Sequence, residues 1–404
     1  MVKFGGTSLA DGASISRAAD SVAKKAKQGV QVAVVVSAMG KTTDFLIDTA
    51  NQACGKAIST AELDDIVAMG ERTVARIFAA TLRARGVKCH SFDPFDSDWP
   101  IVTDERFNNA DPILPVCRER IRMGVQPLLE EGVAVVVPGF IGKSENGTVT
   151  TMGRGGSDVT ALILAKELSA DQVILVTDVD GIMSADPKIV KNPEKLEEIS
   201  MDTLVGLADS GTKFIRKKAL RYKGSEIDVK VISNSAGDLD ADGTIIRGSL
   251  PNNTVVDLYP EPAMAVTIVG KEASESPEIL AEILREIRGA RVTLLGMSIN
   301  HNSLILYLPM SADSLLESFH SIVVRDERAI AMAVRKDLAF IRVRGVGLEE
   351  TPGVIGGIAK ALNSAGINIY GVFTITSSVL IFVDLKDQAK AVRLIEESVR
   401  TNTD

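Results

Sequence analysis

The sequence has few of the residues on which common catalytic and nucleic-acid-binding sites depend. In 404 residues it has three histidines, three cysteines and one tryptophan, and aromatic residues make up only 4% of the chain. His90, His301 and His320 lie far apart in the sequence, and the cysteines lack the spacing of a zinc site. We therefore expect chemistry without histidine bases or zinc, and no aromatic groove for single-stranded nucleic acid.

The sequence also lacks a basic excess and long apolar runs. Its net charge of −8 argues against extended binding to nucleic acid or to an anionic membrane, although it is compatible with a local basic pocket. No apolar run reaches the roughly 18 residues that a membrane-spanning helix needs. The segment GGTSLADG (5–12) interrupts the apolar stretch of a secretory leader. Because Cys54, Cys89 and Cys117 cannot all pair, we expect a reducing, cytoplasmic environment.

The sequence does contain enough apolar residues for two or three domains, with 45% hydrophobic and 24% charged residues. Continuous apolar runs are typical of strands buried on both faces, and they occur at 2–4, 31–37, 133–139 and 172–177, with a more alternating run at 227–233. Helical patterns lie between these runs, for example around 61–85, 111–131 and 158–169. The alternation predicts an α/β domain, a mainly parallel sheet sandwiched by helices, over residues 1–250.

The pattern changes after a turn-rich stretch near residue 250. A strand, a helix and two strands follow over 264–310, and the same order returns over 339–385, before a last helix at 386–400. We interpret this as a linker at 251–263 and two copies of one α+β module, at 264–337 and 338–404. Because neither copy has a cluster of catalytic residues, we expect a regulatory role for both.

Two loops of the first domain combine glycines with cations or hydroxyls beside predicted strands. KFGGTS (3–8) places Lys3 next to a glycine pair, which suggests an anion site, most often for phosphate, although a plain turn would look the same. SAMGKTTD (37–44) offers the hydroxyls of Ser37 and Thr43, which could instead cap a helix. In open parallel sheets such loops converge on one crevice beyond the carboxyl ends of the strands.

Further segments add charges to the same predicted crevice. In TTMGRGGSDVTA (150–161) Arg154 lies between glycines and Asp158 opens a helix, an arrangement that favours a bound carboxylate or other anion. TDVDGIMSADP (177–187) follows a strand and could bind Mg²⁺ or nucleotide hydroxyls, or form a surface turn. GTKF (211–214) adds Lys213, and a lone lysine is usually only a solvated charge.

Taken in order, these motifs resemble those of the aspartate kinases, which have the amino acid kinase fold. The resemblance is carried by KFGGTS, the GE of AMGER (68–72), GRGGSD (153–158), TDVDGI…ADP and GTK. The tail is similar to the paired ACT modules of that family, ferredoxin-like βαββαβ units, with GVGLEETPGV (345–354) and GINI (366–369) in the second copy. In the first copy SESPEIL (274–280) stands where the family has TPG.

The resemblance implies ATP- and Mg²⁺-dependent phosphorylation of the β-carboxylate of L-aspartate to 4-phospho-L-aspartate. That reaction begins the pathway to lysine, threonine and methionine, and the ACT modules imply feedback regulation and at least a homodimer. The nucleophile is a carboxylate with an ordinary pKa near 3.9, so it is already ionised at pH 7 and needs no general base. This agrees with the scarcity of histidine.

The resemblance also implies roles for individual residues. Lys3 and Lys213 would bind the phosphates, and Asp158 would orient these lysines or help to hold the metal shell. Aspartate would be held by Thr43, Glu71, Arg154 and Ser157, with the arginine on the α-carboxylate and the glutamate on the amino group. The nucleotide would contact Lys3, Gly5, Gly6, Thr7, Ser37, Thr177, Asp178, Met183, Lys188, Lys213 and Phe214.

Two alternatives stay open at this point. The first is a kinase of the same fold that acts on glutamate, carbamate or a nucleotide; Arg154 and Glu71 together favour an α-amino acid instead. The second is a binding-only metabolite sensor whose kinase site has decayed. The presence of Lys3, Asp158 and Lys213 argues against decay.

Overall fold

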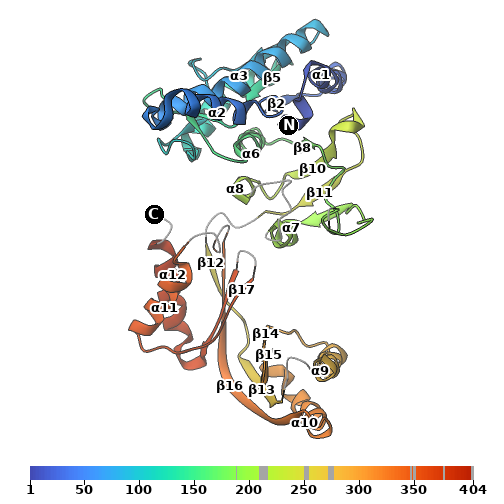
Figure 1. The fold of residues 1–404 in the computed structure, drawn as a ribbon, viewed down its shortest axis with the longest axis vertical. Coiled ribbons are helices and arrows are strands. Elements are labelled where there is room, and N and C mark those ends of the chain that lie inside the picture. Colours follow the sequence, from blue (N-terminus) through green and yellow to red (C-terminus); the bar gives the residue numbers. More distant parts are fainter. Residues whose placement is uncertain are drawn as a thin grey trace. The chain divides into compact units, whose positions relative to one another are not determined.

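The computed structural model describes residues 1–187, 189–208, 217–249, 254–271, 277–345, 348, 352–375 and 378–401. The chain divides into two compact units, Met1–Asn252 and Asn253–Asp404 (Figure 1). No helix among the described residues is long and apolar enough to cross a membrane.

The first unit is built on one large sheet, with the strand order β3-β5-β2-β1-β8-β10-β11-β9 over the described residues. The strands are β1 (Val2–Phe4), β2 (Ala33–Val36), β3 (Cys89–Ser91), β5 (Ala134–Pro138), β8 (Gln172–Thr177), β9 (Glu198–Ser200), β10 (Asp228–Ser233) and β11 (Thr244–Arg247). Neighbours pair in parallel except β10 and β11. The predicted parallel α/β domain is therefore confirmed, with β1 at its centre.

Helices cover both faces of this sheet (Figure 1). On one face, α1 (Gly12–Lys27) and α3 (Thr60–Ala84) share an apolar core with the side chains of Val2 and Phe4. On the other face lies α6 (Gly156–Glu167), whose residues are buried over its first ten positions, Gly156 to Ala165. Because strand side chains alternate between faces, Lys3, between Val2 and Phe4, points toward α6.

The first unit also contains further helices and a second, smaller sheet. They are α2 (Thr42–Cys54), α4 (Leu114–Arg120), α5 (Gln126–Glu130), α7 (Met201–Ala208), α8 (Lys217–Leu220) and a small sheet of β4 (Val102–Thr103), β6 (Ile141–Ser144) and β7 (Val149–Thr151). The single helix expected around 111–131 is interrupted by a π-helical turn at Ile121–Val125. Pro127, two residues after this turn, has no amide hydrogen to donate, which favours such a break.

The second unit is an antiparallel sheet with helices on one face. Its described strands run β14-β15-β13-β16-β18-β17, namely β14 (Gly296–Asn300), β15 (Ser303–Pro309), β13 (Ala263–Gly270), β16 (Ala329–Arg344), β18 (Ser378–Asp384) and β17 (Ile369–Ile375). One core forms under α9 (Pro277–Gly289) and α10 (Leu316–Arg325), and a second under α11 (Val354–Ser364) and α12 (Gln388–Thr401). This arrangement agrees with two ACT modules side by side.

Two features of the second unit differ from the sequence prediction. The expected linker at 251–263 contains a strand, β12 (Val255–Leu258), which pairs with Ile341–Arg344 and packs Val256 against the core under α11 and α12. The expected strand at 339–347 is the second half of the much longer β16, whose first half pairs with β13. The second module therefore includes β12, a strand that precedes the first module in the sequence.

Candidate active site

The KFGGTS and GRGGSD motifs meet in the structure. Nζ of Lys3, in β1, lies 2.7 Å from Oδ1 of Asp158, in the first turn of α6. The two side chains are 15% and 9% exposed, so water screens this ion pair only weakly. The pair joins the central strand of the sheet to the N-terminal end of α6, where the helix dipole favours bound anions.

Glycines make the start of α6 possible. Gly153 and Gly155 have positive φ values of 72° and 86°, a conformation that other residues rarely adopt. At the end of β5, a Cβ atom on Gly139 would lie 2.7 Å from Cβ of Ser157, so the strand and the helix touch backbone to backbone. This contact brings the Ser157 hydroxyl to 3.0 Å from the hydroxyl of Ser37, at the end of β2.

The two glycines of KFGGTS hold the local structure together, in addition to the phosphate-binding role that the sequence predicts. The amide of Gly5 donates to the carbonyl of Val176 in the sheet, which leaves the Gly6 amide as the candidate phosphate donor of the pair. A Cβ on Gly6 would lie 2.9 Å from the Ala38 carbonyl oxygen. Gly6 is therefore required where the loops after β1 and β2 touch, and Thr7 is exposed beside them.

A cavity of about 1170 Å³ lies next to the Lys3–Asp158 pair. Its lining includes Lys3, Ser37, Thr43, Arg154, Ser157, Asp158, Thr177, Asp178 and Met183, all of them predicted site residues. It also includes Asn108, which the sequence did not single out. Gly5, Gly6, Thr7 and Glu71 are not part of this lining. Lys188, Lys213 and Phe214 lie outside the described residues. The volume exceeds that of a typical site for one small molecule, so it has room for a nucleotide and an amino acid.

Glu71 is a buried carboxyl group in α3, the helix that contributes Leu63 and Val67 to the cavity lining. It is 4% exposed and accepts a hydrogen bond of 3.2 Å from the amide of Ala38 on its Oε1 atom. In the described structure its Oε2 atom is buried without a hydrogen-bond partner. Burial raises the pKa of Glu71 to about 7, because a low-dielectric environment disfavours the ionised form. A cation brought close to Glu71 would satisfy it.

Asp64 is a second buried carboxylate of α3, and the sequence analysis missed it. Its two oxygens accept from the amide of Asn108 at 3.1 and 3.0 Å, and from the amide and hydroxyl of Thr151 at 2.8 and 2.7 Å. Asp64 therefore ties the loop at Asn108 to β7, and both line the cavity. Asp64 and Glu71 are seven residues apart, on the apolar face of α3. A charged residue within the apolar stripe of an expected helix is the sequence signal that could have identified Asp64.

Comparison with known proteins defines the class to which this fold and site belong. A model of the amino acid kinase family matches residues 1–233. An aspartokinase of Mycobacterium bovis is 34% identical over 385 residues, covering 91% of this chain and 88% of the relative. An aspartokinase of Geobacillus stearothermophilus is 31% identical over 404 residues, covering 98% of this chain and 96% of the relative.

Solved structures agree with the sequence relatives. The aspartate kinase from Synechocystis has a TM-score of 0.79 and 26% identity, covering 98% of this chain and 69% of that one. E. coli aspartokinase III in complex with aspartate and ADP has a TM-score of 0.56 and 25% identity, covering 98% and 99%. The chain belongs to the amino acid kinase family. The relatives named above are aspartokinases and aspartate kinases, which confirms the resemblance noted in the sequence.

Proposed function

We propose that the protein transfers the γ-phosphoryl group of ATP to the β-carboxylate of L-aspartate, giving 4-phospho-L-aspartate and ADP. The observation that carries this proposal is the single cavity that holds both the Lys3–Asp158 pair and Arg154. The ammonium group of Lys3 suits the phosphates of ATP, and the guanidinium group of Arg154 suits the α-carboxylate of aspartate. The complex of E. coli aspartokinase III with aspartate and ADP supports both ligands.

The reaction requires the protein mainly to position the two substrates and to supply positive charge. A β-carboxylate oxygen attacks the γ-phosphorus, the bond from that phosphorus to the β,γ-bridging oxygen breaks, and ADP leaves with the electron pair. Both reactants are anions, so catalysis consists of bringing them together and stabilising the charge on the transferred group. Lys3 supplies a positive charge to the phosphates, and Asp158 holds its ammonium group in place. Lys213 is the second lysine that we assign to the phosphates.

We also propose that Mg²⁺ binds together with the nucleotide. Among the described residues no group of three or more histidine, cysteine, aspartate or glutamate side chains could hold a metal ion. Magnesium at nucleotide sites is bound mainly by phosphates and water with one or two carboxylates, so Asp158 and Asp178 in the cavity lining fit such an ion. When bound, the metal would neutralise phosphate charge.

We assign aspartate to the side of the cavity formed by Arg154. The guanidinium group can hold the α-carboxylate with two parallel hydrogen bonds, which sets the orientation of the substrate. Thr43 and Ser157 are in the cavity lining, and their hydroxyl groups can donate hydrogen bonds to the substrate. The buried carboxylate of Glu71 compensates the substrate ammonium group, directly or through a neighbouring group, and this gives its unpaired oxygen a role.

The raised pKa of Glu71 predicts a pH dependence of aspartate binding. Below pH 7 the free protein carries a neutral Glu71, because burial raises its pKa to about 7, and a neutral carboxyl group attracts the ammonium weakly. We expect the KM for aspartate to rise about tenfold between pH 8 and pH 6, since one proton must be removed for binding. The KM of Glu71→Gln should be higher at pH 8 and nearly flat over this range. Initial rates at saturating ATP measure both.

Stability gives an independent check of the same group. Because the folded-state pKa of Glu71 is raised, its protonated form stabilises the fold below pH 4.5, and this contribution is lost as pH rises through 7. Glu71→Gln should therefore unfold at a higher temperature than wild type at pH 8 and at a similar temperature at pH 4.5. A variant less stable than wild type at pH 8 would contradict the raised pKa, because it would show that the fold stabilises the ionised carboxylate of Glu71.

An acyl phosphate assay tests the proposed reaction. Purified protein with ATP, Mg²⁺ and L-aspartate should form an acyl phosphate that hydroxylamine traps as the hydroxamate. Hydroxamate from glutamate or carbamate but not from aspartate would assign the protein to another acid of the same kinase class. No product from any acid would favour the metabolite sensor. Omission of Mg²⁺ should abolish the signal.

We further infer a homodimer formed through the second unit and a cytoplasmic enzyme at the head of lysine, threonine and methionine synthesis. The second unit offers sheet edges for such pairing, since β14 and β17 are the end strands of its described order. Free thiols on Cys54, Cys89 and Cys117 agree with a reducing compartment.

A further inference from the structure

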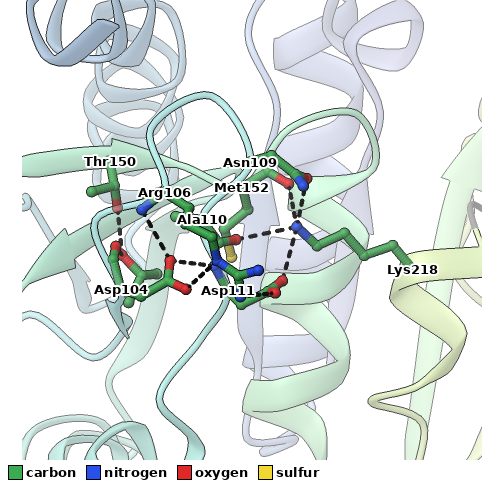
Figure 2. A network of polar contacts seen from close by, with 9 residues as sticks. Asp104, Arg106, Asn109, Ala110, Asp111, Thr150, Met152 and Lys218 are labelled. Carbon is green, nitrogen blue, oxygen red and sulfur yellow. Dashed lines mark hydrogen bonds and ion pairs between the residues drawn. The ribbon is translucent and has the colours of Figure 1, made fainter. Parts of the chain in front are cut away.

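Lys218 is a lysine of the first unit whose ammonium group contacts oxygen atoms of four other residues (Figure 2). From α8 its Nζ atom reaches Oδ1 of Asn109 at 2.8 Å and the carbonyl oxygens of Met152 and Ala110 at 3.1 and 3.2 Å. It also lies 3.1 Å from Oδ1 of Asp111, and the side chain is 20% exposed. One side chain of α8 therefore joins two segments that are distant in the sequence.

These two segments form the wall of the cavity next to Arg154. The Met152 carbonyl belongs to the peptide bond that leads into Gly153, whose φ is 72°. A Cβ on Gly153 would lie 2.9 Å from the Asn108 carbonyl oxygen and 3.0 Å from Oδ1 of Asn109. The turn and the loop therefore touch, and Lys218 binds both sides of the contact.

The other contacts of this region leave a specific task to Lys218. Asp64 holds the backbone of Asn108 from behind, and Asp111 is also paired with Arg106 at 2.6 Å. Asp64 also accepts from the backbone amide and the hydroxyl of Thr151, the residue before Met152. Lys218 adds a hydrogen bond to the carbonyl oxygen of Met152, on the peptide that leads into Gly153. Arg154 directly follows Gly153, so a change in this peptide shifts the point from which the arginine side chain starts.

A lysine suits this position in charge and geometry. An ammonium group has three hydrogens to donate, and here it meets two carbonyl oxygens, an amide oxygen and a carboxylate oxygen. A planar guanidinium group would direct its donors in a fork and could not converge on the same atoms. The segment 209–216, which contains Lys213, directly precedes α8 in the sequence.

We propose that Lys218 is a positioning residue for aspartate: by fixing the Met152–Gly153 peptide against the loop at 108–111, it holds Arg154 where it binds the α-carboxylate. This inference rests on the proposed function, because it assigns Arg154 to aspartate. Its consequence is a change in the affinity for the acid substrate without a comparable change for ATP.

The test is a double-mutant cycle with Lys218→Met and Arg154→Ala, read out as separate KM values for aspartate and ATP. Lys218→Met should raise the KM for aspartate about tenfold or more and change that for ATP less than about threefold. In the Arg154→Ala background the same substitution should change the aspartate KM less than about twofold, because the residue through which Lys218 acts is gone.

Lys223→Met is the matched control. Nζ of Lys223 is also bound by backbone carbonyls, those of Gly224 at 3.2 Å and of Gly248, and the side chain is buried, but these contacts are not with the cavity wall. It should lower the melting temperature and leave the aspartate KM unchanged. If Lys218→Met fails to fold, Lys218→Gln, which keeps one donor group, should raise the aspartate KM in the same direction by a smaller factor.

Three results would overturn the inference. An aspartate KM within threefold of wild type in folded Lys218→Met or Lys218→Gln would remove Lys218 from aspartate binding. An equal change in both backgrounds, or the same change in Lys223→Met, would make its role merely structural. If the wild-type protein made no hydroxamate from aspartate, the proposed function would fail first and the inference with it; an active wild type with an unaffected variant isolates the failure to Lys218.

Discussion

Replacing Lys3 with alanine should lower kcat for aspartate phosphorylation by about 10²- to 10³-fold, which is the usual effect of removing one preorganised charge from a transition state. Lys3 is placed by the central strand of the sheet and held by Asp158 at 2.7 Å, so no reorganisation is needed when charge develops on the phosphoryl group. The measurement is kcat at saturating aspartate and ATP in a coupled ADP assay. Wild-type turnover in a folded variant would remove Lys3 from the catalytic set.

A control for Lys3→Ala must account for Asp158, the residue with which Lys3 forms its ion pair. Loss of Lys3 leaves Asp158, 9% exposed, without its ion-pair partner, and an unpaired buried charge is destabilising. The double variant Lys3→Ala/Asp158→Asn removes that charge and should recover melting temperature without recovering turnover. Recovered turnover would show that Lys3 only neutralises Asp158.

Replacing Arg154 with alanine should raise the KM for aspartate about 10²-fold or more and change that for ATP by only a few-fold. Two charge-assisted hydrogen bonds to a carboxylate contribute on the order of 3 kcal/mol together, which corresponds to about two factors of ten in affinity. Arg154 is exposed in the described structure, so its removal should leave the fold intact. Initial rates against each substrate, with the other saturating, give the two KM values. Equal effects on both would contradict the assignment.

A substrate analogue sharpens this test. β-Alanine has the amino group and the reacting carboxylate of aspartate but lacks the α-carboxylate. Wild type should phosphorylate it poorly, and Arg154→Ala should be no worse than wild type with it, because the interaction under study is absent. A strong preference of wild type over the variant for β-alanine would place the arginine on another part of the substrate.

The sequence predicts the first unit well because strands near the centre of its sheet, such as β2 and β5, are buried at every position. Continuous apolar runs such as 31–37 and 172–177 have no other place than the centre of a parallel sheet, and β2 and β8 lie there. The single polar residue between Val2 and Phe4 must then point to the opposite face from its neighbours. Residue patterns alone do not identify the partner of Lys3; the family resemblance implies Asp158, and the packing of α6 against β1 brings the two side chains together.

The parts that escaped prediction have polar residues where a simple pattern expects apolar ones. The first half of β16 includes Arg335, Lys336 and Asp337, which are exposed and interrupt the alternation. β12 is short and outside its module in sequence, so only its pairing with β16 identifies it. The role of Lys218 depends on three segments meeting in space, and no local pattern shows this.

The most direct test of the account is a crystal structure of the protein with L-aspartate and an unreactive ATP analogue. The account predicts both ligands in the one cavity, with the α-carboxylate on Arg154, the β-carboxylate facing the γ-phosphate, and the ammonium groups of Lys3 and Lys213 on the phosphates. Aspartate bound outside the cavity, or phosphates that contact neither lysine, would contradict it.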